Sequence, residues 1–142
     1  NLSTIKEYFI KGTKYQIIRL SPEHYWGVTP TFIGEARIWI TDLEKTLIDG
    51  LIHPQYCGGM REVIYAFEQG VSKASPSKLY EYAKKTTTVV CKRLGWILDQ
   101  INKYPEIQSQ LEIIPVGYYQ KFDPQGKRLG KHNSRWMMME NL

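Results

Sequence analysis

Carboxylates are the side chains of this sequence that most readily suggest chemistry, and Glu35 and Asp49 are the first pair to consider. A metal-dependent nuclease gathers acidic residues beside a lysine at a sheet edge, where they hold the ion that activates water. The segment Glu35-Ala-Arg37 resembles this arrangement only in part, because Arg occupies the place where Lys is expected. A nuclease with Glu35 and Asp49 as its acids is therefore the alternative function to be tested.

Histidine and cysteine are too scattered to predict a metal centre. The three histidines are His24, His53 and His132, and the two cysteines are Cys57 and Cys91. One His beside one Cys does not make a tetrahedral zinc site. No phosphate-binding glycine loop, nucleophile elbow or HExxH motif occurs in the sequence. We expect no metal, no cofactor and no enzymatic activity, and reduced thiols in a cytoplasmic protein.

Glu44 lies in the stretch "ITDLEKTLIDGL", where it falls on the apolar half of an expected helix. A charge at that position needs a partner. The spacing Thr41-x-x-Glu44 predicts a capping box, in which each of the two side chains binds the backbone amide of the other residue. Asp49 is placed to pair with Lys45 four residues earlier, or to hold a neighbouring loop. These acids are therefore expected to shape a corner of the fold.

A first basic zone spans residues 76–93, where five Lys or Arg residues accompany one Glu. We expect an exposed face that binds DNA or a protein partner, formed by Lys84, Lys85, Lys92, Arg93 and Trp96. Trp on the polar side of a basic helix can anchor a protein partner or stack on a base. The alternative is that Trp96 packs beneath the C-terminal segment.

A second basic zone spans residues 121–135, again with five Lys or Arg residues against one Asp. Within it, Lys127, Arg128 and Lys131 are candidate DNA-binding or partner-binding residues, because a glycine-containing basic loop can contact phosphate. The same segment can instead be a turn-rich connection that places Trp136 inward. Solubilising surface charge is the simpler interpretation of both zones.

These residues belong to a chain of 142 residues with a net charge of +5, enough for one domain with a real core. No apolar run is long enough to cross a membrane. The periodicity predicts an α+β fold with N-terminal antiparallel strands, about four helices, and C-terminal strands that close the domain. The expected strands are residues 4–10, 14–20, 35–40, 111–122 and 134–139, the expected helices are 42–52, 60–70, 76–85 and 89–103, and residues 21–34 are expected to form a loop.

Four blocks in order, "ITDLEKTLIDGL", "GGMREVIYAFEQG", "KLYEYAKK…VCKRLGWILDQ" and "KFDPQGKRLGKHNSRW", resemble the C-terminal domain of the AbiEi family of antitoxins. The resemblance covers most of the chain from about Glu35. It implies a role in an abortive-infection toxin–antitoxin system. The antitoxin would neutralise a nucleotidyltransferase-like toxin and repress its own operon, with operator DNA bound mainly by an N-terminal winged helix. No helix-turn-helix pattern precedes Glu35, so that module is expected to be missing from this chain.

The residues that match the motif of this family would define the fold and take no part in catalysis. They comprise a capped helix, a glycine corner and a closing turn: Thr41, Glu44, Asp49, Gly58, Gly59 and Trp136. The resemblance therefore agrees with the structural role proposed above for Glu44. A standalone nucleic-acid-binding module without a toxin partner is the second alternative.

Overall fold

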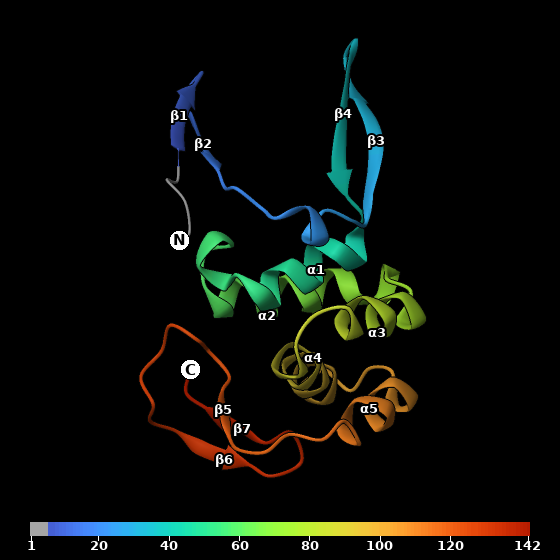
Figure 1. The fold of residues 1–142 in the computed structure, drawn as a ribbon, viewed down its shortest axis with the longest axis vertical. Coiled ribbons are helices and arrows are strands. Elements are labelled where there is room, and N and C mark those ends of the chain that lie inside the picture. The colour runs from blue at the N-terminus through green and yellow to red at the C-terminus, as the bar shows by residue number, and fades with distance from the viewer. Residues whose placement is uncertain (1–5) are drawn as a thin grey trace.

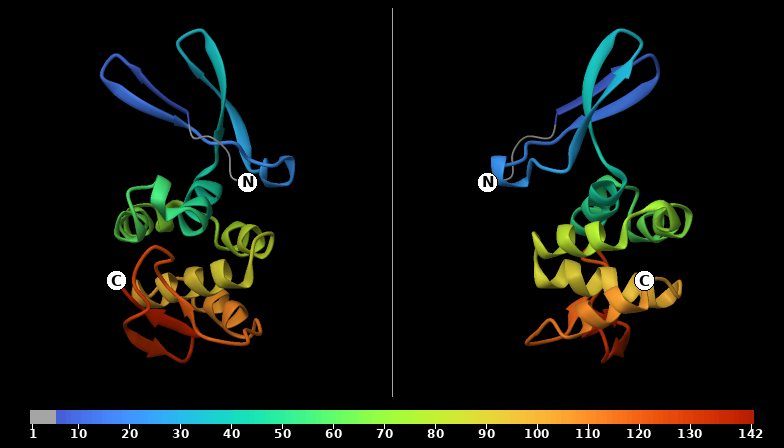
Figure 2. Two further views of the ribbon diagram at one scale, coloured as in Figure 1. Left: turned by 60° about the vertical axis from the view of Figure 1, so that its left-hand side comes forward. Right: turned by 90° about the vertical axis from the view of Figure 1, so that its right-hand side faces the viewer.

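The computed structural model describes residues 6–142 and has the expected α+β class. Two hairpins stand at one end of the molecule and a small sheet closes the other end (Figure 1). The helices lie between these two ends, and the same order is visible after rotation (Figure 2). Thr4 and Ile5 of the expected first strand lie outside the described residues.

The N-terminal hairpins are antiparallel and separate from one another. Strand β1 (Lys6–Ile10) pairs with β2 (Thr13–Ile17) through a two-residue turn. Lys11 and Gly12 both have positive φ there, as hairpins of this kind require. Strand β3 (Val28–Ile33) pairs with β4 (Ala36–Thr41) through the turn at residues 34–35.

In the described part of the chain, five α-helices form the body: α1 (Leu43–Ile52), α2 (Met60–Gly70), α3 (Pro76–Lys84), α4 (Thr88–Gln100) and α5 (Pro105–Glu112). Local chemistry explains several of their ends. The glycine corner before α2 has φ of +82° at Gly58 and +97° at Gly59, a backbone region that other residues rarely enter. Helix α3 starts at Ser75, whose hydroxyl accepts the Lys78 amide, with Pro76 at its first position.

The C-terminal sheet contains three short strands in the order β5-β7-β6. They are β5 (Gln120–Lys121), β6 (Lys131–Asn133) and β7 (Met138–Glu140). Strand β7 is parallel to β5 and antiparallel to β6, so the last strand along the chain lies in the middle of the sheet. Both methionines of β7 are buried, and Met138 joins Phe122 and Trp136 in the core against the helices.

The hydrophobic core is built by the helices and the C-terminal sheet. Helix α4 contributes more core residues than any other element, and contacts α1, α3 and α5 as well as β7. Its Leu94, Ile97 and Leu98 are fully buried. Neither hairpin contributes a residue to this core within the described chain.

Four segments differ from the sequence-based expectation. The expected loop at residues 21–34 contains strand β3, and the expected strand beginning at Leu111 is instead the end of an unpredicted fifth helix, α5. Strand β6 lies in what was expected to be a connection, and most of the expected strand at residues 134–139 is a turn. The prediction of N-terminal and C-terminal strands is confirmed, but their bounds are shorter.

Candidate functional site

The predicted exposed face is wrong for its three residues on α4. Lys92, Arg93 and Trp96 are buried, with 2%, 7% and 7% of their surface exposed. The reason is that α5 and the C-terminal sheet cover the side of α4 that the helical periodicity left polar. The Lys92 ammonium donates to the carbonyl oxygens of Leu111 (3.1 Å) and Glu112 (2.7 Å), and so caps the end of α5.

Arg93 joins two distant segments through their backbones. Its Nη1 donates to the Leu51 carbonyl at 3.1 Å and its Nη2 to the Lys121 carbonyl at 3.2 Å. Burial lowers the pKa of the Arg93 guanidinium to about 10. Its Nε finds no hydrogen-bond partner within residues 6–142. Arg93 is therefore a structural tie between α1 and β5.

Trp96 follows the alternative interpretation and packs beneath the C-terminal segment. Its ring lies 4.2 Å from that of Phe122, measured between centroids. Its Nε1 donates to the Glu140 carboxylate at 2.8 Å, and Asn133 donates to the same oxygen at 2.9 Å. The hydrogen bonds from Trp96 and Asn133 lower the pKa of Glu140. The Trp96 indole thus connects α4 to the C-terminal sheet.

Lys84 and Lys85 remain exposed at the end of α3. The Lys85 ammonium lies 4.9 Å from the Trp26 ring centroid and 5.5 Å from that of Tyr82, and Lys84 lies 5.1 Å from Tyr80. At exposed sites, contacts of this kind between a cation and an aromatic ring are worth about 0.5–1 kcal/mol. The part of the first basic zone that reaches solvent is therefore this corner, beside the base of the β3–β4 hairpin.

The capping box predicted for Glu44 is also wrong. Asp42 is the N-cap of α1 and accepts the Lys45 amide at 2.8 Å, while the Thr41 hydroxyl bonds to that of Thr46 at 2.7 Å. Glu44 accepts the Ser75 amide at 2.7 Å. It thus acts at the start of α3, 31 residues further along the chain.

The Lys78 ammonium lies 3.1 Å from the Glu44 carboxylate and 3.1 Å from that of Asp42. Burial alone would raise the pKa of Glu44, but the hydrogen bonds from Ser75 and Lys78 outweigh it and lower that pKa. Glu44 therefore keeps its charge as a structural group that joins α1 to α3.

The two acids of the nuclease alternative do not converge. Asp49 pairs with Lys45 on α1, as the sequence predicts, and the Lys45 ammonium lies 4.6 Å from the Trp26 ring centroid. Glu35 is in the β3–β4 turn, at the tip of a hairpin that projects away from α1 (Figure 1). Across residues 6–142, no group of three or more His, Cys, Asp or Glu side chains could hold a metal ion.

The second basic zone is exposed as expected at Lys127, Arg128 and Lys131. Its backbone is held firmly, because the Asn141 amide donates to the carbonyls of Asp123 and Lys127, each at 2.9 Å. Next to these cations, Leu129 is 79% exposed. This segment, residues 127–131, is called the basic loop below.

Trp136 points inward, as expected for the closing turn. Its side chain is fully buried against Gly95, and its Nε1 donates to Asp99 at 2.8 Å. Arg135 stacks over the outer side of the ring, 4.8 Å from its centroid, and pairs with Asp99 at 3.0 Å. This packing fixes the turn that precedes β7.

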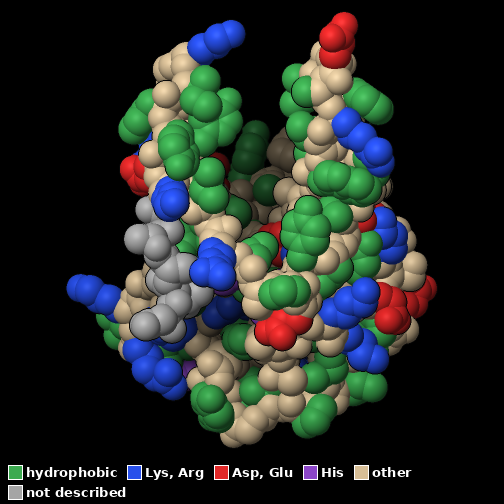
Figure 3. Space-filling model, turned by 45° about the horizontal axis from the view of Figure 1, so that its top comes forward, with side chains coloured by type: hydrophobic (Ala, Val, Ile, Leu, Met, Phe, Trp, Pro, Cys, Tyr) green, Lys and Arg blue, Asp and Glu red, His purple; other side chains and the backbone are tan. Residues whose placement is uncertain are grey.

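The two hairpins carry a set of exposed apolar side chains that the sequence analysis missed. Tyr8, Ile10, Tyr15 and Ile17 share one face of β1–β2 and are 47–55% exposed. The signal was available in the alternation of these residues. In the space-filling view, green side chains cover both hairpins, which stand on either side of a hollow (Figure 3).

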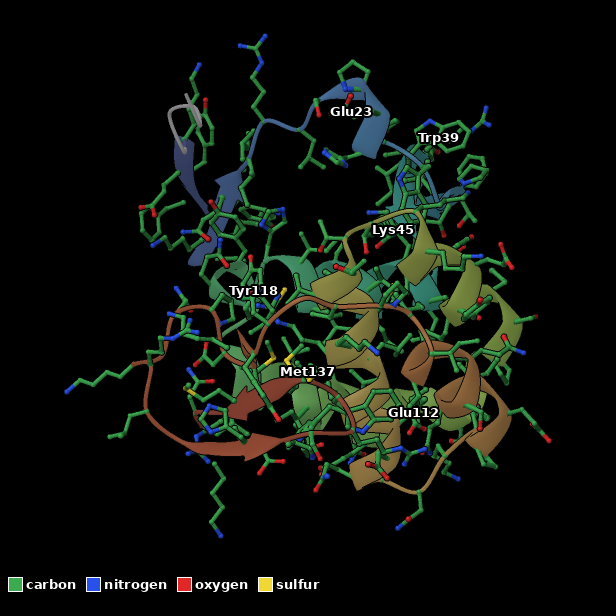
Figure 4. The ribbon with its side chains drawn as sticks, turned by 60° about the horizontal axis from the view of Figure 1, so that its bottom comes forward. Glu23, Trp39, Lys45, Glu112, Tyr118 and Met137 are labelled. Carbon is green, nitrogen blue, oxygen red and sulfur yellow. The ribbon has the colours of Figure 1, made fainter. Side chains whose placement is uncertain are left out.

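The β3–β4 hairpin is apolar on both faces, which is unusual for a sheet in water. We define its tryptophan face as Pro30, Phe32, Arg37 and Trp39, and its isoleucine face as Thr29, Thr31, Ile33, Ala36, Ile38 and Ile40. Trp39 points away from the β1–β2 hairpin (Figure 4). The isoleucine face therefore borders the hollow.

Comparisons with known proteins do not assign a family or a fold relative to this chain. No family model, curated protein or solved structure matches the chain. Among residues 6–142, no helix is long and apolar enough to cross a membrane. What the geometry offers is a set of exposed surfaces: the cationic basic loop, the cationic corner at Lys84 and Lys85, and the apolar hairpins.

Proposed function

We propose that this chain is the non-enzymatic domain of an antitoxin and transcriptional regulator of the AbiEi type. It neutralises a nucleotidyltransferase-like toxin, directly or indirectly, and assists operator binding in the cytoplasm. The four sequence blocks that resemble the family support this proposal. So do the contacts of their acids and glycines, since Glu44, Asp49, Gly58 and Gly59 all serve the scaffold.

The observation that carries the proposal is the basic loop. Lys127, Arg128 and Lys131 project from a backbone that Asn141 holds in place. A rigid, exposed cationic segment can contact phosphates without reading bases, and such contacts position a protein on DNA. Lys84 and Lys85 provide a further cationic group on α3. This arrangement suits a domain that adds affinity to a separate DNA-reading module.

The DNA part of the proposal is tested by charge reversal in the basic loop. We expect K127E/R128E/K131E to weaken binding to the promoter DNA that precedes the gene, and to reduce the slope of log affinity against log salt. The matched control is R61E/K73E/K103E, which alters the net charge equally at exposed residues elsewhere. Equal losses in the two triple variants would assign the effect to net charge and contradict a role for the loop.

The antitoxin part is tested by co-expression with the adjacent gene. We expect the chain with its DNA-binding module to relieve the growth arrest that this gene causes, because antitoxin and toxin act as a pair. Persistent growth arrest despite normal amounts of folded protein would contradict the antitoxin role. Loss of relief in a folded K84E/K85E variant would place the exposed corner of α3 in that role.

A further inference from the structure

We propose that the hairpins form an interface with a second copy of this chain, in which the two isoleucine faces pack against each other. In this dimer the β3–β4 hairpin of each chain fills the hollow between the two hairpins of the other. The inference goes beyond the proposed function, which concerns phosphate and toxin. It assigns a partner to the exposed apolar side chains of the two hairpins.

The isoleucine face is apolar and exposed, so a further layer of protein must cover it to keep it from water. Ile33 is 68% exposed and Ile40 is 46% exposed, on a sheet of only two strands. An isolated two-stranded hairpin is at best marginally stable in water and needs a further layer. The described part of this chain supplies none, because no hairpin residue belongs to the core.

The isoleucine face of a second copy of the chain can supply this layer. A two-fold interface places the same patch opposite itself, so a charged patch meets its own charge. The six residues of the isoleucine face carry no charge, and they are Thr, Ala and Ile throughout. Like-charge repulsion is therefore absent when two such faces meet. β-branched side chains of this kind interdigitate well between packed sheets.

The free edge of β3 is poorly suited to hydrogen-bond a strand of another chain. Ile33 and Ala36 flank the two-residue turn, so the Pro30–Trp39 pair falls at a position where backbone groups point outward. Proline has no N–H to offer there, and it is typical of edges that do not accept another strand. Contact through the faces and through the β4 edge remains, and the faces carry the exposed isoleucines.

Interlocking also offers a partner to the other apolar faces of the hairpins, although Phe9 lies on the opposite face of β1–β2 and is not covered by it. Each chain has three such faces: the Tyr8 and Tyr15 face of β1–β2 and both faces of β3–β4. Three faces cannot pair off within one chain, but six can pair off between two chains. When the isoleucine faces meet, each tryptophan face turns toward the β1–β2 hairpin of the other chain, since Trp39 points away from its own (Figure 4).

The exposed apolar area of the hairpins can be compared with the area of a standard interface. The exposed apolar side chains of the two hairpins offer on the order of 800 Å² per chain, counting roughly half of each aromatic and isoleucine side chain. A standard interface takes about 800 Å² from each partner. The exposed apolar surface of the hairpins is therefore of the size that a standard interface buries.

Sedimentation velocity on the chain of this sequence tests the proposal. We expect a dimer at tens of micromolar protein. The variants I33K/I40K and I33E/I40E should each sediment as a monomer, with helix content unchanged because the core does not include these residues. An equimolar mixture of the two should recover the dimer, because opposite charges then face each other.

The control variant is I113K/L129K, which adds the same charges at two exposed apolar residues outside the hairpins. It should remain dimeric. A monomeric wild type at 100 µM would overturn the inference, as would a dimer in either Ile33/Ile40 variant or a mixture that stays monomeric. Promoter binding by the basic loop is measured separately, so each proposal can fail alone.

Discussion

Replacing Gly95 with alanine should destabilise the protein, although alanine is the better helix former. A Cβ on Gly95 would overlap the Trp136 ring, whose Cη2 would lie only 2.6 Å away. Trp136 is fully buried and its Nε1 is bonded to Asp99, so the ring cannot move without losing that bond. The clash opposes the gain in helix propensity.

The magnitude follows from three contributions. Overpacking of a filled core costs about 1–3 kcal/mol. Loss of the Trp136–Asp99 hydrogen bond costs about 1 kcal/mol. The exchange of glycine for alanine inside a helix returns about 1 kcal/mol. The expected net loss for Gly95→Ala is about 2 kcal/mol, which corresponds to a fall in Tm of roughly 4–8 °C for a chain of this length.

Urea and thermal unfolding, followed by circular dichroism, measure this loss. The control is Gly70→Ala at the end of α2, where a Cβ would meet only Leu43 Cδ1 at 3.4 Å, an ordinary contact. We expect that variant to match the wild type or to gain up to about 1 kcal/mol. A Gly95→Ala protein as stable as the wild type would refute the packing argument for the helix α4 and Trp136 contact.

Three further predictions concern buried polar groups. Arg93→Met should cost about 2–4 kcal/mol in urea unfolding, because two buried carbonyls lose their donor, whereas Lys85→Met should change stability by less than about 0.5 kcal/mol. The fold lowers the pKa of Glu44 below its ordinary value of 4.5. The ionised carboxylate therefore makes its full contribution to the free energy of unfolding above pH 4.5, and this contribution is lost as the pH falls through the lower pKa of the folded state. Glu44→Gln should therefore flatten the fall of Tm with pH below about 4.5, and an unchanged acid profile would contradict this. Glu140→Gln should cost about 1–2 kcal/mol and shift the Trp96 fluorescence, since one oxygen accepts both donors at that site; an unshifted spectrum would count against the bond.

The elements that were predictable from the sequence have strong local signals. Helix α2 has both of its predicted ends, because two glycines precede it and Gly70 ends it. Helix α3 starts where Ser75 and Pro76 predict. Strand β3 was missed because Pro30 reads as a loop residue, and strands with proline occur only at edges.

Tertiary contacts explain most of the remaining errors, but not the missed helix α5. Its N-cap, Tyr104, has φ of +51° and no side-chain cap, yet Pro105 at its first position and Glu106 in its first turn are local start signals that the sequence-based prediction did not use. Helix α5 buries Lys92, and the Lys92 ammonium donates to a backbone carbonyl at the end of α5. The periodicity of α4 alone could not predict a partner on another helix. Glu44 was correctly assigned a structural role, but its partner Ser75 lies too far along the chain for periodicity to find.

The position of β7 between β5 and β6 has a consequence for biosynthesis. The ribosome delivers β5 and β6 before β7, yet these two strands contact each other only through β7. The sheet can therefore assemble only after residues 138–140 emerge, and until then Phe122 and Trp96 lack the cover of Met138 and the bond to Glu140. A nascent chain arrested before that point would hold its helices in a loosened state, open to chaperones.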